Sequence, residues 1–454
     1  MPGFEFDKDS IALLREALER LDQGFSHLPA VAPAGASHDP ANLRRVLLEV
    51  AERMHDNYPY FHPQYAGQML KPPHPVARLA YSLAMHINPN NHALDGGRAS
   101  SALEKEAVGE IARMFGWETH LGHLCGGGTM ANLEALWVAG QLRPDGIVLA
   151  STQAHYTHSR ISAVLKLPFE GVPCDRFARM DLSALEDRLK RGGIGTVVAT
   201  LGTTAVGSLD PLPAILALRE RYGFRLHADC AYGGYYTLAS NLSPPTRSAF
   251  DRLAEVDSIV IDPHKHGLQP YGCGCVLFRD PEIGKFYKHE SPYTYFSSGD
   301  LHLGEISLEC SRPGAAAVAL WATQRLLPLV RGGEFAGMLE ACRAAALDLH
   351  ARLAADPRFV VAFPPELDIV VWAVKSPSSA EASERARVIF AESAKRDVHL
   401  ALAELPVNFF HDRGKSLGGS ETVTCLRSVV MKPEHAGSIE RILASLYTPP
   451  GGTE

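Results

Sequence analysis

Apolar residues in the first part of the chain recur every three to four positions, a spacing typical of amphipathic helices. One such stretch covers residues 10–25 and begins at Ser10, a residue type that caps helix N-termini. A connector rich in Pro, Ala and Gly over residues 30–40 leads to a second helical stripe, which ends at Met54. The two helices have little core of their own, so we expect them to pack on another domain or another subunit.

The next part of the chain, residues 56–98, is rich in Pro, His, Asn and Tyr and predicts irregular structure over a surface or an interface. A helix is then predicted to start at Ser101, because Ser101 and Glu104 form the Ser-x-x-Glu pattern of a capping box, and to run to Phe115. We therefore treat residues 1–98 as an N-terminal helical segment that contributes to an interface.

From about residue 120 the pattern changes, and short β-branched runs alternate with helical stretches. This alternation predicts an α/β domain with a mostly parallel sheet, whose ligand should lie outside the carboxyl ends of the strands. We expect this large domain to span residues 99–330. Its predicted strands are Gly146–Ala150, Thr196–Leu201, Arg225–Asp229, Ser258–Asp262 and Gly274–Phe278, with helices around 130–141, 181–191, 211–222 and 246–254.

The remaining residues, 331–454, predict a smaller C-terminal α+β domain. Residues 312–355 have the pattern of one or two long helices, interrupted near Arg331-Gly-Gly333. The predicted elements after them are strands at Asp368–Val374, Val398–Ala403 and Thr422–Val429 and helices at 379–396 and 433–446.

The composition is that of an ordinary soluble globular protein, with 46% hydrophobic and 21% charged residues in 454. A net charge of −7 provides no electrostatic footprint for nucleic acid or for an anionic membrane. The N-terminus resembles neither a signal peptide nor a basic presequence, and no apolar stretch is long enough to span a bilayer. The eight cysteines are scattered like core thiols in a reducing compartment. We therefore expect a cytoplasmic protein without nucleic-acid or membrane partners.

Two short patterns contain residue types that bind metals. Cys273-Gly-Cys275 is one, but no second cysteine pair completes a site, and alternate positions on a buried strand explain it better. His227 and Asp229 are the other, and no third ligand stands at a helpful spacing. No metal is expected.

Two charged residues stand at or shortly after the ends of predicted strands. Lys265 follows the apolar run Ser258–Ile261, and partial burial there favours the neutral amine, which can form a Schiff base with an aldehyde. Taken alone, Lys265 would be an ordinary surface lysine in a turn. Asp229 ends another buried strand, where a carboxylate needs a partner or a function, although a capping or turn aspartate is an equal alternative.

Further polar groups belong to the same edge of the predicted sheet. The turn Gly126-Gly-Gly128-Thr129 precedes a helix, so its backbone N–H groups and the helix dipole could bind phosphate, although a plain tight turn fits equally well. The turn matches neither glycine motif of nucleotide-binding proteins. His155 lies four residues after a strand, and Thr200, Thr203 and Thr204 lie at the end of another. A phosphate cradle, a histidine, hydroxyls, a carboxylate and a lysine are unlikely to share one edge by chance.

Pyridoxal phosphate requires this combination of groups: an anion cradle for its phosphate, a lysine for its aldehyde, a carboxylate against its ring nitrogen, and flat partners on its ring faces. No metal is needed for that chemistry. The predicted contacts are Gly127, Gly128 and Thr129 for the phosphate, Lys265 for the aldehyde, Asp229 for the ring nitrogen and His155 and Ala231 for the ring faces, with Thr200, Thr203 and His264 beside them.

The motifs and their order resemble the group II pyridoxal-phosphate-dependent decarboxylases, a fold-type I family that includes glutamate, tyrosine and aromatic amino-acid decarboxylases. The resemblance runs from about residue 50 to the C-terminus, and the pair of motifs His-x-Asp-x-Ala-x-Gly and Asp-x-His-Lys is specific. The matching pieces are residues 62–68, 125–132, 153–155, 200–207, 227–233 and 262–265.

The resemblance implies a fold-type I enzyme that decarboxylates an L-amino acid to the amine through a Schiff base and a quinonoid intermediate. It also implies a homodimer with the active site at the subunit interface, where the N-terminal segment embraces the partner. Arg427 stands where the family places an arginine that can bind the substrate carboxylate, and His92 is a candidate for the substrate pocket. Tyr293 or Tyr295 would protonate the α-carbon.

The sequence also departs from the family. The phosphate turn contains Cys-Gly-Gly-Gly-Thr where many members have Thr-Ser-Gly-Gly-Ser, and residues 309–314 resemble the archaeal tyrosine/aspartate decarboxylases and sphingosine-phosphate lyase. Two alternatives therefore stay open. One is a carbon–carbon lyase of the latter type, which would need cationic residues for a substrate phosphate. The other is a non-catalytic homologue. The substrate side chain is not predicted.

Overall fold

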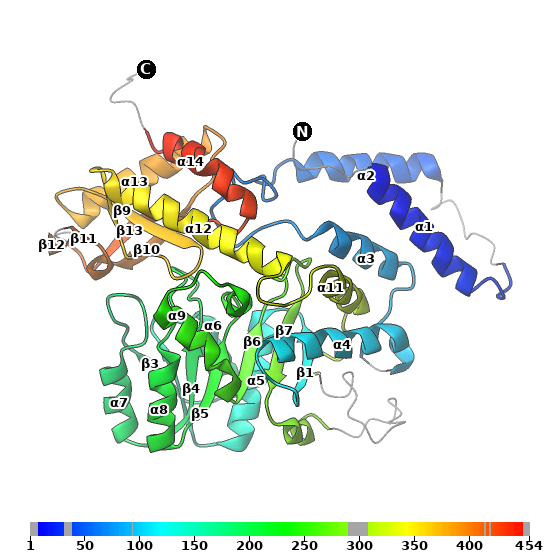
Figure 1. Ribbon diagram of the computed structural model, residues 1–454, viewed down its shortest axis with the longest axis horizontal. Helices are drawn as coiled ribbons and strands as arrows, with labels where there is room; N and C mark the ends of the chain where they lie inside the picture. The colour runs from blue at the N-terminus through cyan, green and yellow to red at the C-terminus, as the bar shows by residue number, and fades with distance from the viewer. Residues whose placement is uncertain are drawn as a thin grey trace.

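The computed structural model describes residues 8–30, 39–92, 94–288, 307–412, 415–416 and 419–447. A large domain with a central sheet lies below a smaller domain with a second sheet, and two N-terminal helices extend to one side of both (Figure 1). The two sheets follow one another along the chain, which matches the predicted α/β and α+β parts.

Seven strands form the large sheet in the order β1-β7-β6-β5-β4-β2-β3. Strand β7 is antiparallel to both of its neighbours, and the other pairs are parallel. The strands are buried along almost their whole length, as expected for parallel strands covered by helices. Their bounds are β1 Leu121–Cys125, β2 Ile147–Ser151, β3 Phe169–Val172, β4 Ile194–Thr200, β5 Arg225–Asp229, β6 Ser258–Ile261 and β7 Gly274–Phe278.

All five predicted strands of the large domain are confirmed, and two of them, β5 and β7, have the predicted bounds. Strands β1 and β3 were not predicted, because β1 contains a glycine and a histidine and β3 has only four residues. Helix α6 was also not predicted. The helices of this domain are α5 Gly128–Leu142, α6 Thr157–Leu165, α7 Leu182–Lys190, α8 Leu212–Tyr222 and α9 Pro244–Asp251.

The small domain contains a four-stranded antiparallel sheet in the order β10-β13-β9-β8. The predicted interruption near residue 332 is confirmed, since one long helix ends at Leu326 and the next begins at Glu334. A separate hydrophobic cluster, which includes the fully buried Trp372, lies between the sheet and its helices. Helix α11 (Gly314–Leu326) comes before this domain and packs on α3 (Pro75–Met85) and α4 (Arg98–Met114). The elements of the small domain are α12 Glu334–Ala355, β8 Phe359–Val361, β9 Ile369–Val374, α13 Ser379–Ala394, β10 Ala401–Pro406, β11 His411–Asp412, β12 Lys415–Ser416, β13 Thr422–Val429 and α14 Ile439–Ser445.

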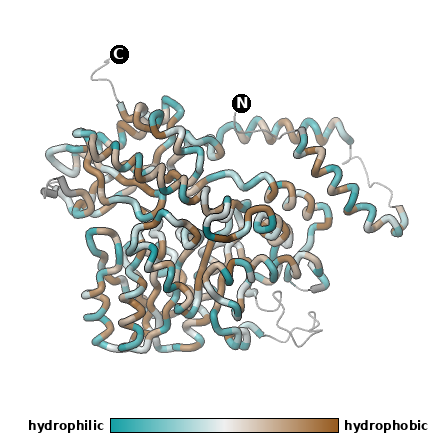
Figure 2. The backbone as a smooth tube through the Cα atoms, viewed as in Figure 1, coloured by the Kyte–Doolittle hydropathy of each residue, from teal (hydrophilic) through white to brown (hydrophobic). Residues whose placement is uncertain are grey.

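The two N-terminal helices, α1 (Lys8–Gly24) and α2 (Pro40–Met54), form where the periodicity predicts them. Helix α1 already includes Lys8, so Ser10 lies within its first turns and the predicted cap there is wrong. Apolar and polar residues alternate along both helices (Figure 2), and none of the residues of α2 is buried.

The prediction of irregular structure over residues 56–98 is wrong in its middle, where helix α3 (Pro75–Met85) forms. Proline at the first helical position is favourable, because its missing N–H would have no partner there, and the His74 side chain accepts a hydrogen bond from the backbone N–H of Val76. Helix α3 packs against α11.

The predicted capping box is also wrong. Helix α4 (Arg98–Met114) begins three residues before Ser101, and both Ser101 and Glu104 are buried inside it. Glu104 instead forms a buried ion pair with Arg312 and accepts a hydrogen bond from the backbone N–H of Leu124 at 2.9 Å. Among the residues that the structure describes, no helix is both long enough and apolar enough to cross a membrane.

Candidate active site

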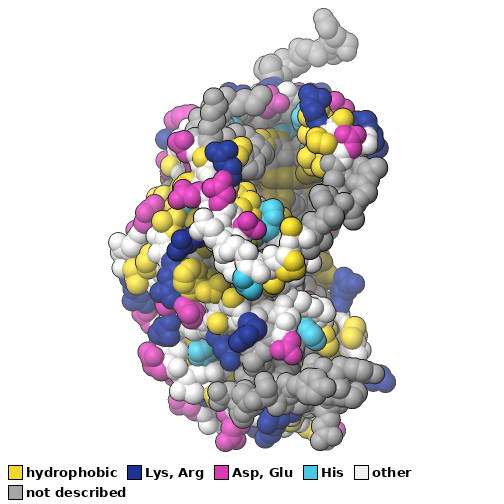
Figure 3. Space-filling model, turned by 90° about the vertical axis from the view of Figure 1, so that its right-hand side faces the viewer, with side chains coloured by type: hydrophobic (Ala, Val, Ile, Leu, Met, Phe, Trp, Pro, Cys, Tyr) yellow, Lys and Arg dark blue, Asp and Glu magenta, His cyan; other side chains and the backbone are white. Residues whose placement is uncertain are grey.

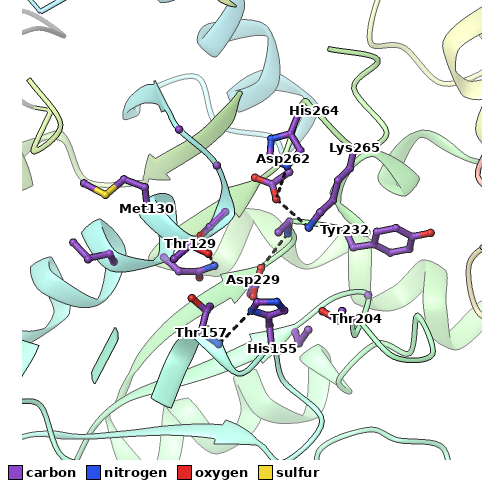
Figure 4. A pocket seen from close by; sticks show the side chains of 18 of the residues that line it. Thr129, Met130, His155, Thr157, Thr204, Asp229, Tyr232, Asp262, His264 and Lys265 are labelled. Carbon is purple, nitrogen blue, oxygen red and sulfur yellow. Dashed lines mark hydrogen bonds and ion pairs between the residues drawn. The ribbon is translucent and has the colours of Figure 1, made fainter. Parts of the chain in front are cut away.

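A cavity of about 500 Å³ opens at the carboxyl ends of β2, β4 and β5, between the start of α5 and the turn after β6 (Figure 4). This is the edge at which the sequence places the ligand. Nine of the residues predicted for the site line the cavity: Gly127, Gly128, Thr129, His155, Thr200, Asp229, Ala231, His264 and Lys265.

The glycine turn before α5 requires its glycines. Gly127 has a φ of 145°, which side chains rarely adopt, and a Cβ on Gly274 would lie 2.5 Å from the Gly127 Cα. The backbone N–H of Gly126 donates to both carboxylate oxygens of Glu309, at distances of 2.9 and 3.1 Å. The turn therefore already holds an anionic group, as expected of free N–H groups at a helix N-terminus.

Asp229, at the end of β5, is buried and held by two donors. Its Oδ2 lies 2.9 Å from His158 Nε2, and its Oδ1 accepts the backbone N–H of Ala231 at 3.1 Å. Burial by itself would raise the pKa of Asp229, but the hydrogen bond and charge of His158 hold that pKa well below its ordinary value. Asp229 is therefore a fixed negative charge on the cavity wall.

His155 lies beside Asp229 on the same wall (Figure 4). Its Nδ1 accepts the backbone N–H of Thr157 at 3.2 Å, and burial lowers the pKa of the ring. The ring of Tyr156 lies against it, with centroids 4.3 Å apart. His155 thus presents a neutral, flat ring with a fixed orientation.

Lys265 enters the cavity from the turn after β6, and one fifth of its side chain is exposed. Its Nζ lies 3.0 Å from Asp262 Oδ2. His264 beside it is oriented by a hydrogen bond from its Nδ1 to the carbonyl of Cys273 at 2.8 Å. An amine, a carboxylate and a ring thus converge from a single turn.

The three threonines after β4 have different positions. Thr200 lines the cavity, and its buried Oγ1 has no hydrogen-bond partner among the described residues. Thr204 also lines the cavity. Thr203 does not, because its side chain points to the backbone N–H of Ser208, which it accepts at 3.0 Å. The prediction that Thr203 contacts the cofactor is therefore not supported by the geometry.

The structure does not bring Arg427 into the cavity lining. Its guanidinium donates to the carbonyls of Gly67, Thr204 and Ala205 and to the Gln68 side chain, at 2.7 to 3.2 Å. Four of its five N–H groups are therefore used. Arg427 contacts the carbonyl of Thr204, a residue that lines the cavity. Its role at the substrate carboxylate stays a prediction.

The remaining predictions concern His92 and the two tyrosines Tyr293 and Tyr295. His92 lies outside the lining, in the loop before α4, where its backbone N–H donates to the Asn90 side chain. Tyr293 and Tyr295 lie outside the described residues.

Sequence reasoning missed two residues of the site. His158, the partner of Asp229, lies in the first turn of α6, three residues after His155, and that spacing was an available signal. Glu309, which lines the cavity, carried no such signal because its partner Gly126 is 183 residues away. His227 was considered as a metal ligand, but its two ring nitrogens contact Asn132 and Ser258.

These residues fit pyridoxal phosphate. The glycine turn binds an anion, the hydroxyl of Thr200 has no partner in the described part of the chain, and Lys265 and Asp229 provide an amine and a fixed carboxylate in one cavity. The described residues contain no cluster of three or more His, Cys, Asp or Glu side chains that could hold a metal ion.

Comparison with curated proteins finds relatives along most of the chain. The L-tyrosine decarboxylase of Enterococcus faecium is 27% identical over 422 residues, which cover 68% of this chain and 69% of the relative. The L-aspartate decarboxylase of Thermococcus kodakarensis is 31% identical over 287 residues, which cover 62% of this chain and 72% of the relative.

Solved structures share the fold. The crystal structure of mouse CSAD superposes with a TM-score of 0.78 at 20% identity, covering 97% of this chain and 98% of that one. Oryza sativa TDC with PLP and tryptamine gives a TM-score of 0.77 at 17% identity, with the same coverage. The fold is therefore that of fold-type I enzymes, as predicted.

The conserved domain of the pyridoxal-dependent decarboxylases matches residues 137–375, more than half of the chain. This range includes His155, Asp229 and Lys265. The chain belongs to the pyridoxal-dependent decarboxylase family and is a carboxy-lyase that acts on an amino acid with pyridoxal phosphate as its cofactor.

Proposed function

We propose that this cavity carries out α-decarboxylation of an L-amino acid and that Lys265 is the residue that binds the cofactor covalently. The observation that supports this most directly is the meeting of the Lys265 amine and the fixed Asp229 carboxylate in one cavity beside an anion-binding glycine turn. The backbone N–H groups of Gly127, Gly128 and Thr129 would hold the phosphate.

Bound pyridoxal phosphate supplies an aldehyde for exchange with the substrate amine and a ring that accepts the electron pair left when CO2 departs. Asp229 would hold the proton on the ring nitrogen, since its low pKa leaves it ionised and His158 and Ala231 fix its orientation. His155 would lie against one face of the ring and Ala231 against the other.

The Lys265 amine would also hold and return a proton at its Nζ. Asp262, whose Oδ2 lies 3.0 Å from this atom, would give the protonated amine an ionic partner. One N–H of Arg427 has no hydrogen-bond partner among the described residues, and we assign this group to the substrate carboxylate beside Thr204. Tyr293 or Tyr295 stays our candidate for the proton donor to the α-carbon.

We propose that the substrate is an amino acid of the kind for which the relatives are named. These relatives include L-tyrosine and L-aspartate decarboxylases. A screen of the amino acids for CO2 release by the purified, cofactor-loaded protein tests this directly. Formation of a long-chain or other aldehyde in place of CO2 would instead support a carbon–carbon lyase.

Lys265→Ala tests the assignment of the lysine. Turnover should fall below detection, and the visible absorption of the covalently bound cofactor should disappear. Lys190→Ala, which removes an exposed lysine far from the cavity, serves as the control and should retain both. Normal CO2 release by Lys265→Ala would refute the assignment.

We further propose a homodimer, in which α1 and α2 cover a second copy of the chain. The support for this dimer is the set of large apolar side chains that α1 and α2 expose. They are part of the hydrophobic surface visible in Figure 3. They are Ile11, Leu13, Leu43, Val46, Leu47, Leu48, Val50 and Met54. The division into residues 1–98, 99–330 and 331–454 is retained with this proposal.

A cytoplasmic location is part of the same proposal. All eight cysteines are free thiols, and six of them are buried. A reducing compartment maintains thiols in this state. Fractionation of cells that express the protein, with an enzyme of known compartment as the marker, measures the location.

A further inference from the structure

His266 follows Lys265 directly and lies completely buried between the two domains. Its Nδ1 is 3.0 Å from the backbone carbonyl of Tyr232 in the large domain, and its Nε2 is 2.8 Å from Asp368 Oδ2, just before β9 of the small domain. One ring therefore joins the turn that carries Lys265 to two other segments of the chain.

The partners of this ring are both oxygen atoms that can accept a hydrogen bond. One is the carbonyl of Tyr232, which faces Nδ1, and the other is the carboxylate of Asp368, which faces Nε2. Burial by itself would raise the pKa of Asp368, but the charge and hydrogen bond of His266 hold that pKa below its ordinary value.

Asp368 is fully buried and has a second donor in the Tyr232 hydroxyl, at 2.5 Å from its Oδ1. The Tyr232 ring extends away from the cavity to reach it (Figure 4). The rings of Tyr232 and Tyr236 lie edge-on against His266, with centroids 4.7 and 5.2 Å away, and exclude water from the pair. A desolvated carboxylate whose two oxygens each have their own donor defines distances more tightly than an exposed ion pair.

The segments joined by His266 carry the groups that meet the cofactor. Tyr232 follows Asp229 by three residues and Ala231 by one, and Lys265 precedes His266. A change at His266 therefore alters the position of the amine relative to the ring-nitrogen carboxylate. Small errors in such positions are costly, since a displacement of about 1 Å can reduce turnover about 100-fold.

We propose that the hydrogen-bonded pair of His266 and Asp368 is a positioning device that sets Lys265 against Asp229 and fastens both to the small domain. This rests on the proposed roles of Lys265 and Asp229. Neither member of the pair touches the cavity, so both are positioning residues.

Three variants test the pair. His266→Phe and Asp368→Ala each remove the hydrogen bonds, and we expect kcat to fall about 10- to 100-fold per bound cofactor while the KM for substrate changes less than about 3-fold. Asp368→Asn is the conservative rescue. Its amide can donate to a neutral His266 and still accept from Tyr232, so the geometry survives without the charge and most of kcat should return.

Spectroscopy provides a readout that does not depend on turnover. With cofactor bound, His266→Phe and Asp368→Ala should shift the visible absorption band or its pH titration, and their dissociation constants for pyridoxal phosphate should rise. Should one of the two variants not fold, the other tests the same contact from the opposite side.

His435→Gln is the matched control, since His435 is an equally buried histidine of the small domain that bonds to Lys432 and Tyr65. It should lower stability without altering the absorption band. The proposal is overturned if His266→Phe keeps the native spectrum and the native kcat per bound cofactor, or if Asp368→Asn loses as much as Asp368→Ala. Either result leaves the assignment of Lys265 intact, because that depends on Lys265→Ala alone.

Discussion

Two regions of the molecule differ in how far other residues contact their side chains. One is the carboxyl-end edge of the large sheet, and the other is the first two helices of the chain. At the sheet edge, Asp229 and His155 are oriented by contacts within the chain. Helix α2 has no buried residue, and Leu47 at its centre is two-thirds exposed. The first region is built by contacts within the chain, whereas the second exposes apolar side chains that the described residues do not cover.

The difference separates two kinds of information in the sequence. A polar residue at the end of a buried strand is placed by the fold of one chain, so its position is determined once the sheet forms. An amphipathic stripe indicates only that a helix has an apolar face, and says nothing about what covers that face. The two regions can therefore be tested separately.

The largest expected effect is at the sheet edge. Asp229→Asn should lower kcat about 1,000-fold, because the amide cannot provide the negative charge that retains the proton on the cofactor ring. The measurement is CO2 release at saturating substrate and cofactor. An amide occupies the same space, so the melting temperature with cofactor should change little. A variant with native kcat would show that the fixed charge at Asp229 is not part of the reaction.

Sequence reasoning succeeded where a short-range signal existed. Asp229 ends a predicted strand, Lys265 and His155 follow predicted strands within five residues, and the structure brings all three into one cavity. Glu104 shows the opposite case. Its local pattern predicted a capping box, but its partner Arg312 is 208 residues further along the chain.

Long-range partners account for the other omissions. Nothing near Asp368 in the sequence indicates that it pairs with His266, 102 residues earlier. Arg427 was placed correctly on a strand, but its neighbours Gly67 and Thr204 come from distant segments, so its hydrogen bonds to their carbonyls could not be predicted.

The second effect tests the exposed helices. Leu47→Glu combined with Val50→Glu should weaken self-association by at least about 100-fold, since each protomer would lose two apolar side chains whose burial contributes about 1.5–3 kcal/mol apiece. Sedimentation velocity over a range of concentrations measures this. Asn42→Glu adds charge to the same helix without removing an apolar side chain and is the control. If the double variant associates as the native chain does, α2 is not the dimer surface.

A smaller effect concerns the pH dependence of stability at the contact between Tyr65, in the N-terminal segment, and Lys432, in the small domain. Lys432 Nζ donates to the carbonyl of Tyr65 at 2.7 Å, and burial lowers the pKa of Lys432 to about 7, from an ordinary value of 10.5. Between these values the unfolded chain holds a proton that the folded chain has lost, so this group makes the free energy of unfolding rise with pH.

Lys432→Met should remove that pH dependence. The difference in unfolding free energy between the native chain and the variant should grow by up to about 1.4 kcal/mol per pH unit above pH 7. Urea unfolding at pH 7, 8 and 9 measures it, and Lys395→Met, at an exposed lysine, is the control. Parallel pH curves for the native chain and Lys432→Met would contradict the lowered pKa.

The smallest effect returns to the glycine turn. The carboxylate of Glu309 accepts a hydrogen bond from the backbone N–H of Gly126. Burial raises the pKa of Glu309, because its charged form is less stable there than in water. Glu309→Gln removes a negative charge beside the phosphate cradle and should tighten the binding of pyridoxal phosphate about 3- to 10-fold, the size of one like-charge contact at about 4 Å in water. Titration of the absorption change measures the affinity. Pyridoxal, which lacks the phosphate, is the matched ligand and should bind equally well to the native chain and the variant, so an equal gain for both ligands would show that Glu309 does not act on the phosphate.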